Sequence, residues 1–292
     1  MVYGVKYGTT LLGVSLRDYP QVASLLEQCG FESIWLPEHL VFPASMPATY
    51  PYSETGLPPV TSDSPTYDPW VLCGYLAAAT ERIRLGTNIY ILPLRHPLQT
   101  ARSVVTVDRV SGGRVTLGVG VGWLAEEFEY LGLSFGDRGR RTDATITAVR
   151  RLWSEEVVEV HDDFFDFGPV KFYPKPLQRT GIPIEIGGSS PPALRRAGAL
   201  GDGWIEVGCR DLADFESKLA VVDAARREAG RTGPFEVTVS AALARTLDDY
   251  RRLEDAGATR VIAMPRAMGA RLSPAEMADW ANRFSEEVIT RV

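Results

Sequence analysis

The chain has 292 residues, of which 45% are hydrophobic and 23% charged, and this composition is typical of a globular protein with a substantial core. Its 31 basic and 37 acidic residues leave a net charge of -6, and the lack of long basic runs argues against a nucleic-acid partner. No stretch approaches the roughly 18 consecutive apolar residues of a membrane helix, and the amino terminus does not resemble a signal peptide, so a cytoplasmic protein is expected.

Short β-rich runs alternate with amphipathic helical stretches along nearly the whole chain. Eight runs are predicted as strands, at residues 4–8, 33–39, 84–92, 114–122, 183–188, 203–208, 235–241 and 259–265. Eight strand-helix units whose strands are apolar on both faces predict an α/β fold, a single (β/α)8 TIM barrel domain over residues 1–292. A doubly wound open sheet is the alternative.

Two segments are additional to the eight strand-helix units of the predicted barrel. Residues 41–67 are rich in proline and have almost no helical pattern, so they predict a long loop after the second strand that overhangs the active-site face. Residues 157–176 predict a pair of irregular strands inserted before the fifth strand. Because this insertion lies between a helix and a strand, we expect it nearer the opposite rim.

The cysteines and histidines do not predict a metal site. Cys29, Cys73 and Cys209 form neither a disulfide framework nor a zinc-binding spacing, and they are expected to be structural thiols. The three histidines do not form a ligand motif. His96 precedes a helix start and is expected to cap it, whereas His161 is expected to be structural or exposed.

Chemistry in such a barrel belongs at the carboxyl ends of the strands. Those ends carry Glu38 and His39, residues 88–90, residues 120–123, residues 187–190 and residues 206–208. The imidazole of His39 suits a general acid or a hydrogen-bond donor to a ring heteroatom, although a histidine that merely holds the loop is the alternative.

The turn after the fifth strand, GGSS at 187–190, leads directly into a helix. Free backbone amides at that helix start, with the hydroxyls of Ser189 and Ser190, predict a phosphate site to which Arg195 and Arg196 could add charge. A tight strand-helix turn with two exposed arginines is the alternative. The charged residues at 138–143 are explained by ion pairing around another helix start.

The stretch LGVGVGW at 117–123 carries three alternate glycines after an apolar run. The dinucleotide-binding fingerprint fails here, because the position that requires its third glycine holds Trp123. Gly118, Gly120 and Gly122 are instead expected on one face of a barrel strand, where missing side chains would admit a flat ring to the backbone.

Four stretches together resemble the luciferase-like flavin and deazaflavin oxidoreductase superfamily: GFESIWLPEHL at 30–40, residues 79–132 from ATERIRLG to FEYLG, RGRRTDA at 138–144 and IEIGGSSPPALRRAGALGDGW at 184–204. The resemblance implies a (β/α)8 barrel that holds FMN or the deazaflavin coenzyme F420. The loop sequence PASMPATYPYSE is similar to the F420-dependent branch. The resemblance also implies a small organic substrate and a homodimer.

The same resemblance assigns site residues. It implies Glu38 and His39 as catalytic residues, with His39 as proton donor near the redox ring, and a cis peptide bond at Asn88-Ile89 that supports the back of that ring. Trp123 stands where sugar-phosphate dehydrogenases of the family carry a catalytic glutamate, so a bulkier apolar substrate against Trp123, Tyr50 or Trp35 is expected. The expected cofactor-binding residues are Asn88, Ile89, Gly120, Gly122, Glu126, Gly187, Gly188 and Ser189.

Hydride transfer between F420 and a C=C, C=N or C=O bond is therefore the expected function, because the cofactor carries the chemistry and the protein positions it and supplies a proton. An FMN-dependent two-component monooxygenase is the alternative, and it would depend on a closed loop that excludes water. A barrel that binds flavin without catalysing a reaction is a third hypothesis. A sugar-phosphate isomerase or lyase is disfavoured, since the strand ends carry no evident catalytic lysine or carboxylate pair.

Overall fold

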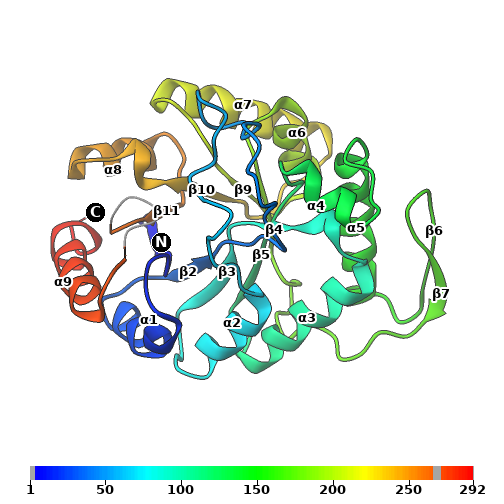
Figure 1. The fold of residues 1–292 in the computed structure, drawn as a ribbon, viewed down its shortest axis with the longest axis horizontal. Coiled ribbons are helices and arrows are strands. Elements are labelled where there is room, and N and C mark those ends of the chain that lie inside the picture. The colour runs from blue at the N-terminus through cyan, green and yellow to red at the C-terminus, as the bar shows by residue number, and fades with distance from the viewer. Residues whose placement is uncertain (1–3, 266–270, 292) are drawn as a thin grey trace.

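The computed structural model describes residues 4–265 and 271–291, and in them eight parallel strand positions close into a barrel surrounded by helices (Figure 1). The pairing of the third and fourth barrel strands joins the two ends of the sheet and completes the ring. The strands are β1 (Lys6–Thr9), β2 (Ser33–Leu36), β3 (Arg84–Thr87), its short continuation β4 (Tyr90–Ile91), β5 (Val115–Gly120), β8 (Ile184–Gly187), β9 (Gly203–Ile205), β10 (Glu236–Ser240) and β11 (Arg260–Ala263). Each predicted strand is present, and the barrel is confirmed.

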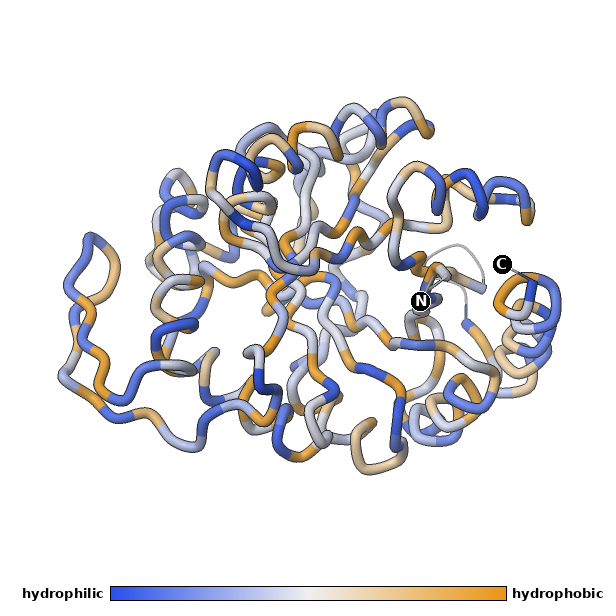
Figure 2. The backbone as a smooth tube through the Cα atoms, turned by 180° about the vertical axis from the view of Figure 1, so that it is seen from behind, coloured by the Kyte–Doolittle hydropathy of each residue, from blue (hydrophilic) through white to orange (hydrophobic). Residues whose placement is uncertain are grey.

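The helices lie outside the strands and cover their outward faces (Figure 1). They are α1 (Tyr19–Gln28), α2 (Pro69–Ala77), α3 (Pro97–Val110), α4 (Ala125–Tyr130), α5 (Arg138–Ser154), α6 (Pro191–Leu200), α7 (Leu212–Glu228), α8 (Leu247–Asp255) and α9 (Pro274–Phe284), with short turns η1 (Leu16–Asp18), η2 (Leu92–Leu94), η3 (Ala241–Leu243) and η4 (Ser285–Ile289). Figure 2 shows apolar and polar positions alternating along these outer helices. His96 caps α3 as expected, since its ring accepts a hydrogen bond from the Leu98 amide at 3.2 Å.

A single indole fills the middle of the barrel. Trp35 on β2 points inward and is 1% exposed, and its Nε1 donates to the Ser33 hydroxyl at 2.8 Å. Gly8 and Gly86 make room for it, because a Cβ at either position would lie 2.9 or 2.6 Å from the indole. The expectation that Trp35 could contact a substrate is therefore wrong: the indole is barrel core and lies beneath the strand ends.

A charged layer closes the barrel below that indole. Arg260 is buried with its guanidinium 5.1 Å from the Trp35 ring and bridges Glu185 at 2.7 Å and Glu32 at 3.0 Å. Although burial opposes its charge, these carboxylates raise the pKa of Arg260 further above its already high value. The network satisfies charges that would otherwise be costly to bury, and it leaves the opposite end of the barrel for a ligand.

The predicted insertion before the fifth strand is an antiparallel hairpin, β6 (Val158–His161) and β7 (Asp166–Val170), which projects at the side of the barrel (Figures 1 and 2). Its expected position near the opposite rim holds only for its base, where Lys175 donates to the Leu152 carbonyl near the end of α5. Its tip packs on His96, with ring centroids 5.2 Å from Phe165 and 5.5 Å from Phe167. The hairpin is long enough to reach the rim where α3 begins.

Candidate active site

The chain bulges inward between β3 and β4. The Asn88-Ile89 peptide bond is cis, as expected, and the Asn88 amide donates to the Leu36 carbonyl at 2.8 Å. The Ile89 side chain enters the mouth of the barrel and packs on Trp35, Ile205 and Ile262. Ile89 therefore forms an apolar floor above the barrel core.

The glycines of the 117–123 stretch leave room for this bulge to pack against β5. A Cβ at Gly118 would collide with the Thr87 carbonyl oxygen, and one at Gly120 would collide with the end of the Ile89 side chain. The expectation that these glycines leave open space for a flat ring is therefore wrong, because the chain's own bulge takes that space. Gly122 lies beyond β5 with φ of +79°, a backbone conformation that favours glycine at the turn before α4.

Glu38 is buried at the end of β2 and anchors the other side of the bulge. One carboxylate oxygen accepts from the Ile91 amide at 2.8 Å, and the other pairs with the Arg95 guanidinium. Burial raises the pKa of Glu38, while Arg95 and the Ile91 amide oppose that shift. Since both oxygens already have protein partners, this geometry favours a positioning role for Glu38 over a direct role in proton transfer.

His39 is held by a buried carboxylate from a different part of the chain. Its Nδ1 lies 2.9 Å from one oxygen of Glu127 on α4, whose side chain is 1% exposed. The other oxygen of Glu127 accepts from the backbone amides of Leu40 at 2.7 Å and Val41 at 3.4 Å. Glu127 therefore joins α4 to His39 and to the first residues of the long loop.

Glu127 is a site residue that the sequence reasoning missed. A signal was present, because Leu124 at the N-cap of α4 and Phe128 within the helix are buried, and Glu127 lies on the same face of the helix. The predicted neighbour, Glu126, is only half-buried, and among the described residues its carboxylate makes no hydrogen bond or ion pair. Its expected contact with a cofactor remains a prediction.

Aromatic side chains form one wall beside His39. The Trp123 ring lies 5.7 Å from the imidazole and 5.1 Å from the Tyr50 ring, both in edge-to-face geometry. Phe42 lies 4.7 Å from the imidazole on the loop side. The structure thus brings together His39, Trp123 and Tyr50, which the sequence separates into three regions, and the long loop does overhang the strand ends as expected.

The turn after β8 is less open than expected. The Gly188 amide donates to the Ile205 carbonyl at 3.2 Å, and the Ser189 hydroxyl donates to the Val207 carbonyl. The Ser189 amide donates to the hydroxyl of Tyr52 from the long loop; burial raises the pKa of that phenol, and this hydrogen bond opposes the rise. The prediction of free donors at this turn is therefore wrong for these three groups, because protein acceptors already satisfy them.

The neighbouring helix starts supply positive charge. The expected ion pairing is present for Arg140, which bridges Asp137 and Asp163, and for Arg196, which pairs with Asp143. Arg138 differs, because its guanidinium stacks 3.8 Å from the Phe135 ring and its buried Nε has no partner in the described part of the chain. Burial and the nearby Arg196 lower the pKa of Arg138. A buried donor without an acceptor fits an anionic ligand group.

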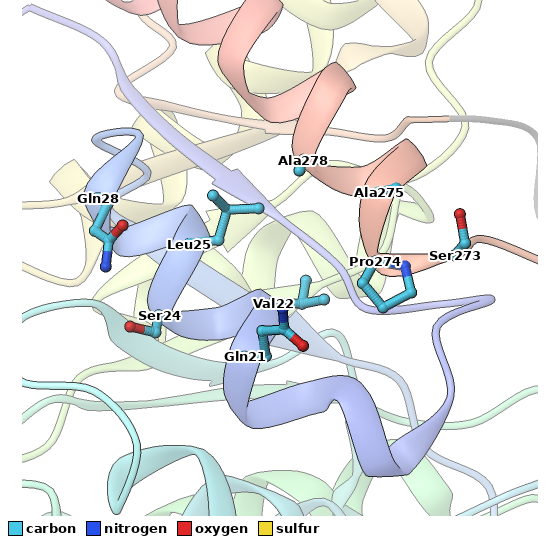
Figure 3. Close-up of a pocket in the computed structure, with 9 residues that line it drawn as sticks. All are labelled: Gln21, Val22, Ser24, Leu25, Gln28, Ser273, Pro274, Ala275 and Ala278. Carbon is cyan, nitrogen blue, oxygen red and sulfur yellow. The ribbon is translucent and has the colours of Figure 1, made fainter.

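The rest of the described chain does not form a competing site. A groove of about 720 Å³ lies between α1 and α9, and Figure 3 shows its side chains pointing from the two helices. None of its nine lining residues is titratable, and it lies outside the ring of strands. Among the described residues, no cluster of His, Cys, Asp and Glu side chains suits a metal ion, and no helix is long and apolar enough to span a membrane.

Comparisons with known proteins agree with this fold. The chain is 35% identical over 278 residues to an uncharacterized protein of Mycobacterium tuberculosis, covering 94% of this chain and 95% of the other. It is 32% identical over 236 residues to an F420-dependent glucose-6-phosphate dehydrogenase of Microbacterium testaceum, covering 79% of this chain and 64% of that one. The fold matches a monooxygenase of Streptomyces bottropensis with a TM-score of 0.78 at 22% identity, over 98% of this chain and 99% of that one.

The match to a whole-family model is equally extensive. Residues 4–287 match the model of the luciferase-like monooxygenases, so the match includes all eight barrel strands and the site at their carboxyl ends. The resemblance drawn from the four sequence stretches is thereby confirmed at the level of the family. The chain belongs to the luciferase-like monooxygenase family.

Proposed function

We propose that this protein is an F420-dependent oxidoreductase that transfers a hydride between the deazaflavin and a C=C, C=N or C=O bond of an organic substrate. The observation that carries the proposal is the His39 imidazole, fixed by Glu127 beside an aromatic wall, at the same end of the barrel as the apolar floor of Ile89. A hydride acceptor needs a proton as well, and a positioned imidazole at this place can move one.

The described residues fit a cofactor with a flat ring and an anionic tail. When bound, F420 supplies the carbon centre that gives or takes the hydride. The bulge at Asn88 and Ile89 would support the ring, and Gly120 and Gly187 permit that support, because a Cβ at either position would collide with Ile89. The Nε of Arg138, which has no partner among the residues that the structure describes, offers a donor for the tail.

The remaining predicted contacts follow from this placement. The turns after β5 and β8 border the Ile89 floor. The proposed cofactor-side residues are Gly122 and Glu126 at the first turn and Gly188 and Ser189 at the second. A cofactor can bind the backbone amide of Ser189 only if the Tyr52 hydroxyl, which now accepts a hydrogen bond from that amide, moves away or shares it.

The aromatic wall indicates the class of substrate. Trp123 and Tyr50 present ring edges and faces to the space beside His39, a surface that suits an apolar or planar organic molecule. Similarity to the glucose-6-phosphate dehydrogenase supports F420 as the cofactor. Trp123, however, offers neither the charge nor the hydrogen-bond acceptors that a sugar phosphate would require. A homodimer and a cytoplasmic location remain predictions from the sequence.

An FMN-dependent monooxygenase is the second candidate, and one observation favours it. Tyr52 holds the long loop down on the β8 turn, and its ring also packs where a Cβ of Gly208 would lie 3.0 Å away. A loop closed in this way would keep water from a reactive cofactor, which oxygen chemistry needs more than a proton donor.

Parallel titration of the purified protein with F420 and with FMN tests the proposal. We expect F420 to bind with a micromolar or lower Kd and FMN to bind more weakly, as measured by the quenching of intrinsic tryptophan fluorescence. Binding of FMN without binding of F420 would replace the proposal by its alternative. With F420 bound, His39→Ala should lower kcat by at least about a hundredfold, the usual contribution of a general acid.

A further inference from the structure

We propose that Glu127 is the positioning residue of this site and that it fixes which nitrogen of His39 exchanges a proton with a ligand. The proposal rests on the proposed function only for the use that is made of that proton. The arrangement of the imidazole itself follows from the hydrogen bonds of one buried carboxylate.

The carboxylate of Glu127 faces three donors and, among residues 4–265 and 271–291, no competing cation. One oxygen accepts from the Leu40 and Val41 amides, at 2.7 and 3.4 Å, and the other lies 2.9 Å from His39 Nδ1. Backbone amides can only donate, so the orientation of the carboxylate is set by the loop and not by the histidine. The oxygen that remains for His39 is therefore held in place before the imidazole makes its contact.

An ionised carboxylate accepts hydrogen bonds and cannot donate them. Nδ1 of His39 must therefore carry the hydrogen in this pair, whether the ring is neutral or cationic. In the neutral ring, Nε2 is then the bare nitrogen and takes up a proton; in the cation, Nε2 gives one up. Within the described chain Nε2 has no hydrogen-bond partner, so it is the ring nitrogen available to a ligand.

The substitution Glu127→Gln makes a sharp test, because it keeps the shape and changes the donor pattern. The Gln carbonyl oxygen must stay on the Leu40 and Val41 amides, since these offer only N–H groups. Its NH2 group then faces His39 and donates to Nδ1. We therefore expect the neutral imidazole to invert, with the hydrogen moving from Nδ1 to Nε2.

The imidazole tautomer is read directly by long-range 1H-15N correlation spectra of histidine-labelled protein without ligand, at about pH 8.5, two pH units above the ordinary imidazole pKa of about 6.5. The chain has three histidines, so the His39→Gln variant identifies the signals of His39. Glu129→Gln serves as the matched control, because Glu129 lies exposed on the same helix. Circular dichroism verifies that each variant is folded.

Wild type and the Glu129→Gln variant should show Nδ1 protonated and Nε2 bare, and Glu127→Gln should exchange the two 15N shifts. A wild-type ring protonated at Nε2, or a Glu127→Gln spectrum without inversion, would overturn the proposal, and the wild-type result decides it even if the variant fails to fold. Because these spectra need no cofactor, they remain valid if F420 proves to be the wrong cofactor. With an active enzyme, Glu127→Gln should also lower kcat by about a hundredfold with little change in KM.

Discussion

Replacement of Gly118 by alanine tests the close packing between β5 and the bulge after β3. A Cβ at Gly118 would lie well inside 3.0 Å of the Thr87 carbonyl oxygen and 2.9 Å from Ile205 Cδ1. The carbonyl cannot rotate away, because Thr87 belongs to β3 and its hydroxyl also donates to the Gly118 carbonyl at 2.7 Å. Gly118→Ala should therefore reach the upper range of overpacking costs, a loss of about 3 kcal/mol in the free energy of unfolding.

Two further glycine-to-alanine substitutions show how the change in stability depends on the space at each position. At Gly120 the added Cβ meets the end of the Ile89 side chain, which can change rotamer, so Gly120→Ala should destabilise less and should instead disturb the floor and weaken cofactor binding. At Gly74 on α2 the Cβ meets nothing within 4 Å, so Gly74→Ala should stabilise by about 0.5–1 kcal/mol.

Thermal unfolding followed by circular dichroism measures all three variants. A loss of about 3 kcal/mol corresponds to a fall in Tm of roughly 6–12 °C for a domain of this size. An unchanged Tm for Gly118→Ala would refute the reasoning, since it would mean that the Thr87 carbonyl does not occupy the space beside Gly118.

Three further predictions concern the long loop, the Arg138 donor proposed for the anionic tail of the cofactor, and the charged layer around Arg260. Tyr52→Phe removes the phenol oxygen that accepts from the Ser189 amide, so phosphate and FMN should bind a few-fold more tightly in a fluorescence titration; weaker binding would instead make Tyr52 a ligand contact. Arg138→Leu should weaken binding of the anionic cofactor about tenfold, and unchanged binding would place the tail elsewhere. Burial raises the pKa of Glu32, but Arg260, Ser33 and Lys6 together lower it further than burial raises it. The ionised group therefore contributes stability above about pH 4.5 that is lost as pH falls through its lowered pKa. Arg260→Met should lower the free energy of unfolding at pH 7 by about 3–5 kcal/mol and should reduce the loss of stability at acid pH. Urea denaturation at pH 7 and below about pH 4.5 measures both effects.

The sequence predicted the barrel well because strand and helix periods are local properties. Each of the eight runs lies within a few residues of a barrel strand, and the family resemblance placed the cis bond at Asn88-Ile89. The glycines were harder to interpret. The absence of a side chain at Gly118 and Gly120 indicates that something approaches the backbone, but it does not indicate whether that is a ligand or another part of the same chain.

The contacts across the site could not be predicted by the same means. Glu127 and His39 are 88 positions apart, and the choice between Glu126 and Glu127 depends on the rotation of a six-residue helix. Tyr52 reaches Ser189 from a loop without periodic pattern. Such contacts depend on how the barrel closes, a property of the whole chain.

Glu38 and His39 are neighbours in sequence, but separate parts of the fold hold them. Glu38 is tied to Ile91 and Arg95, which fix the Ile89 floor, whereas His39 is tied to Glu127, which also holds the first amides of the long loop. A displacement of the loop at Leu40 would therefore disturb the Glu127 carboxylate, and with it the imidazole, while the floor would keep its own support. We accordingly expect substitutions at Leu40 and Val41 to alter proton transfer more than cofactor affinity.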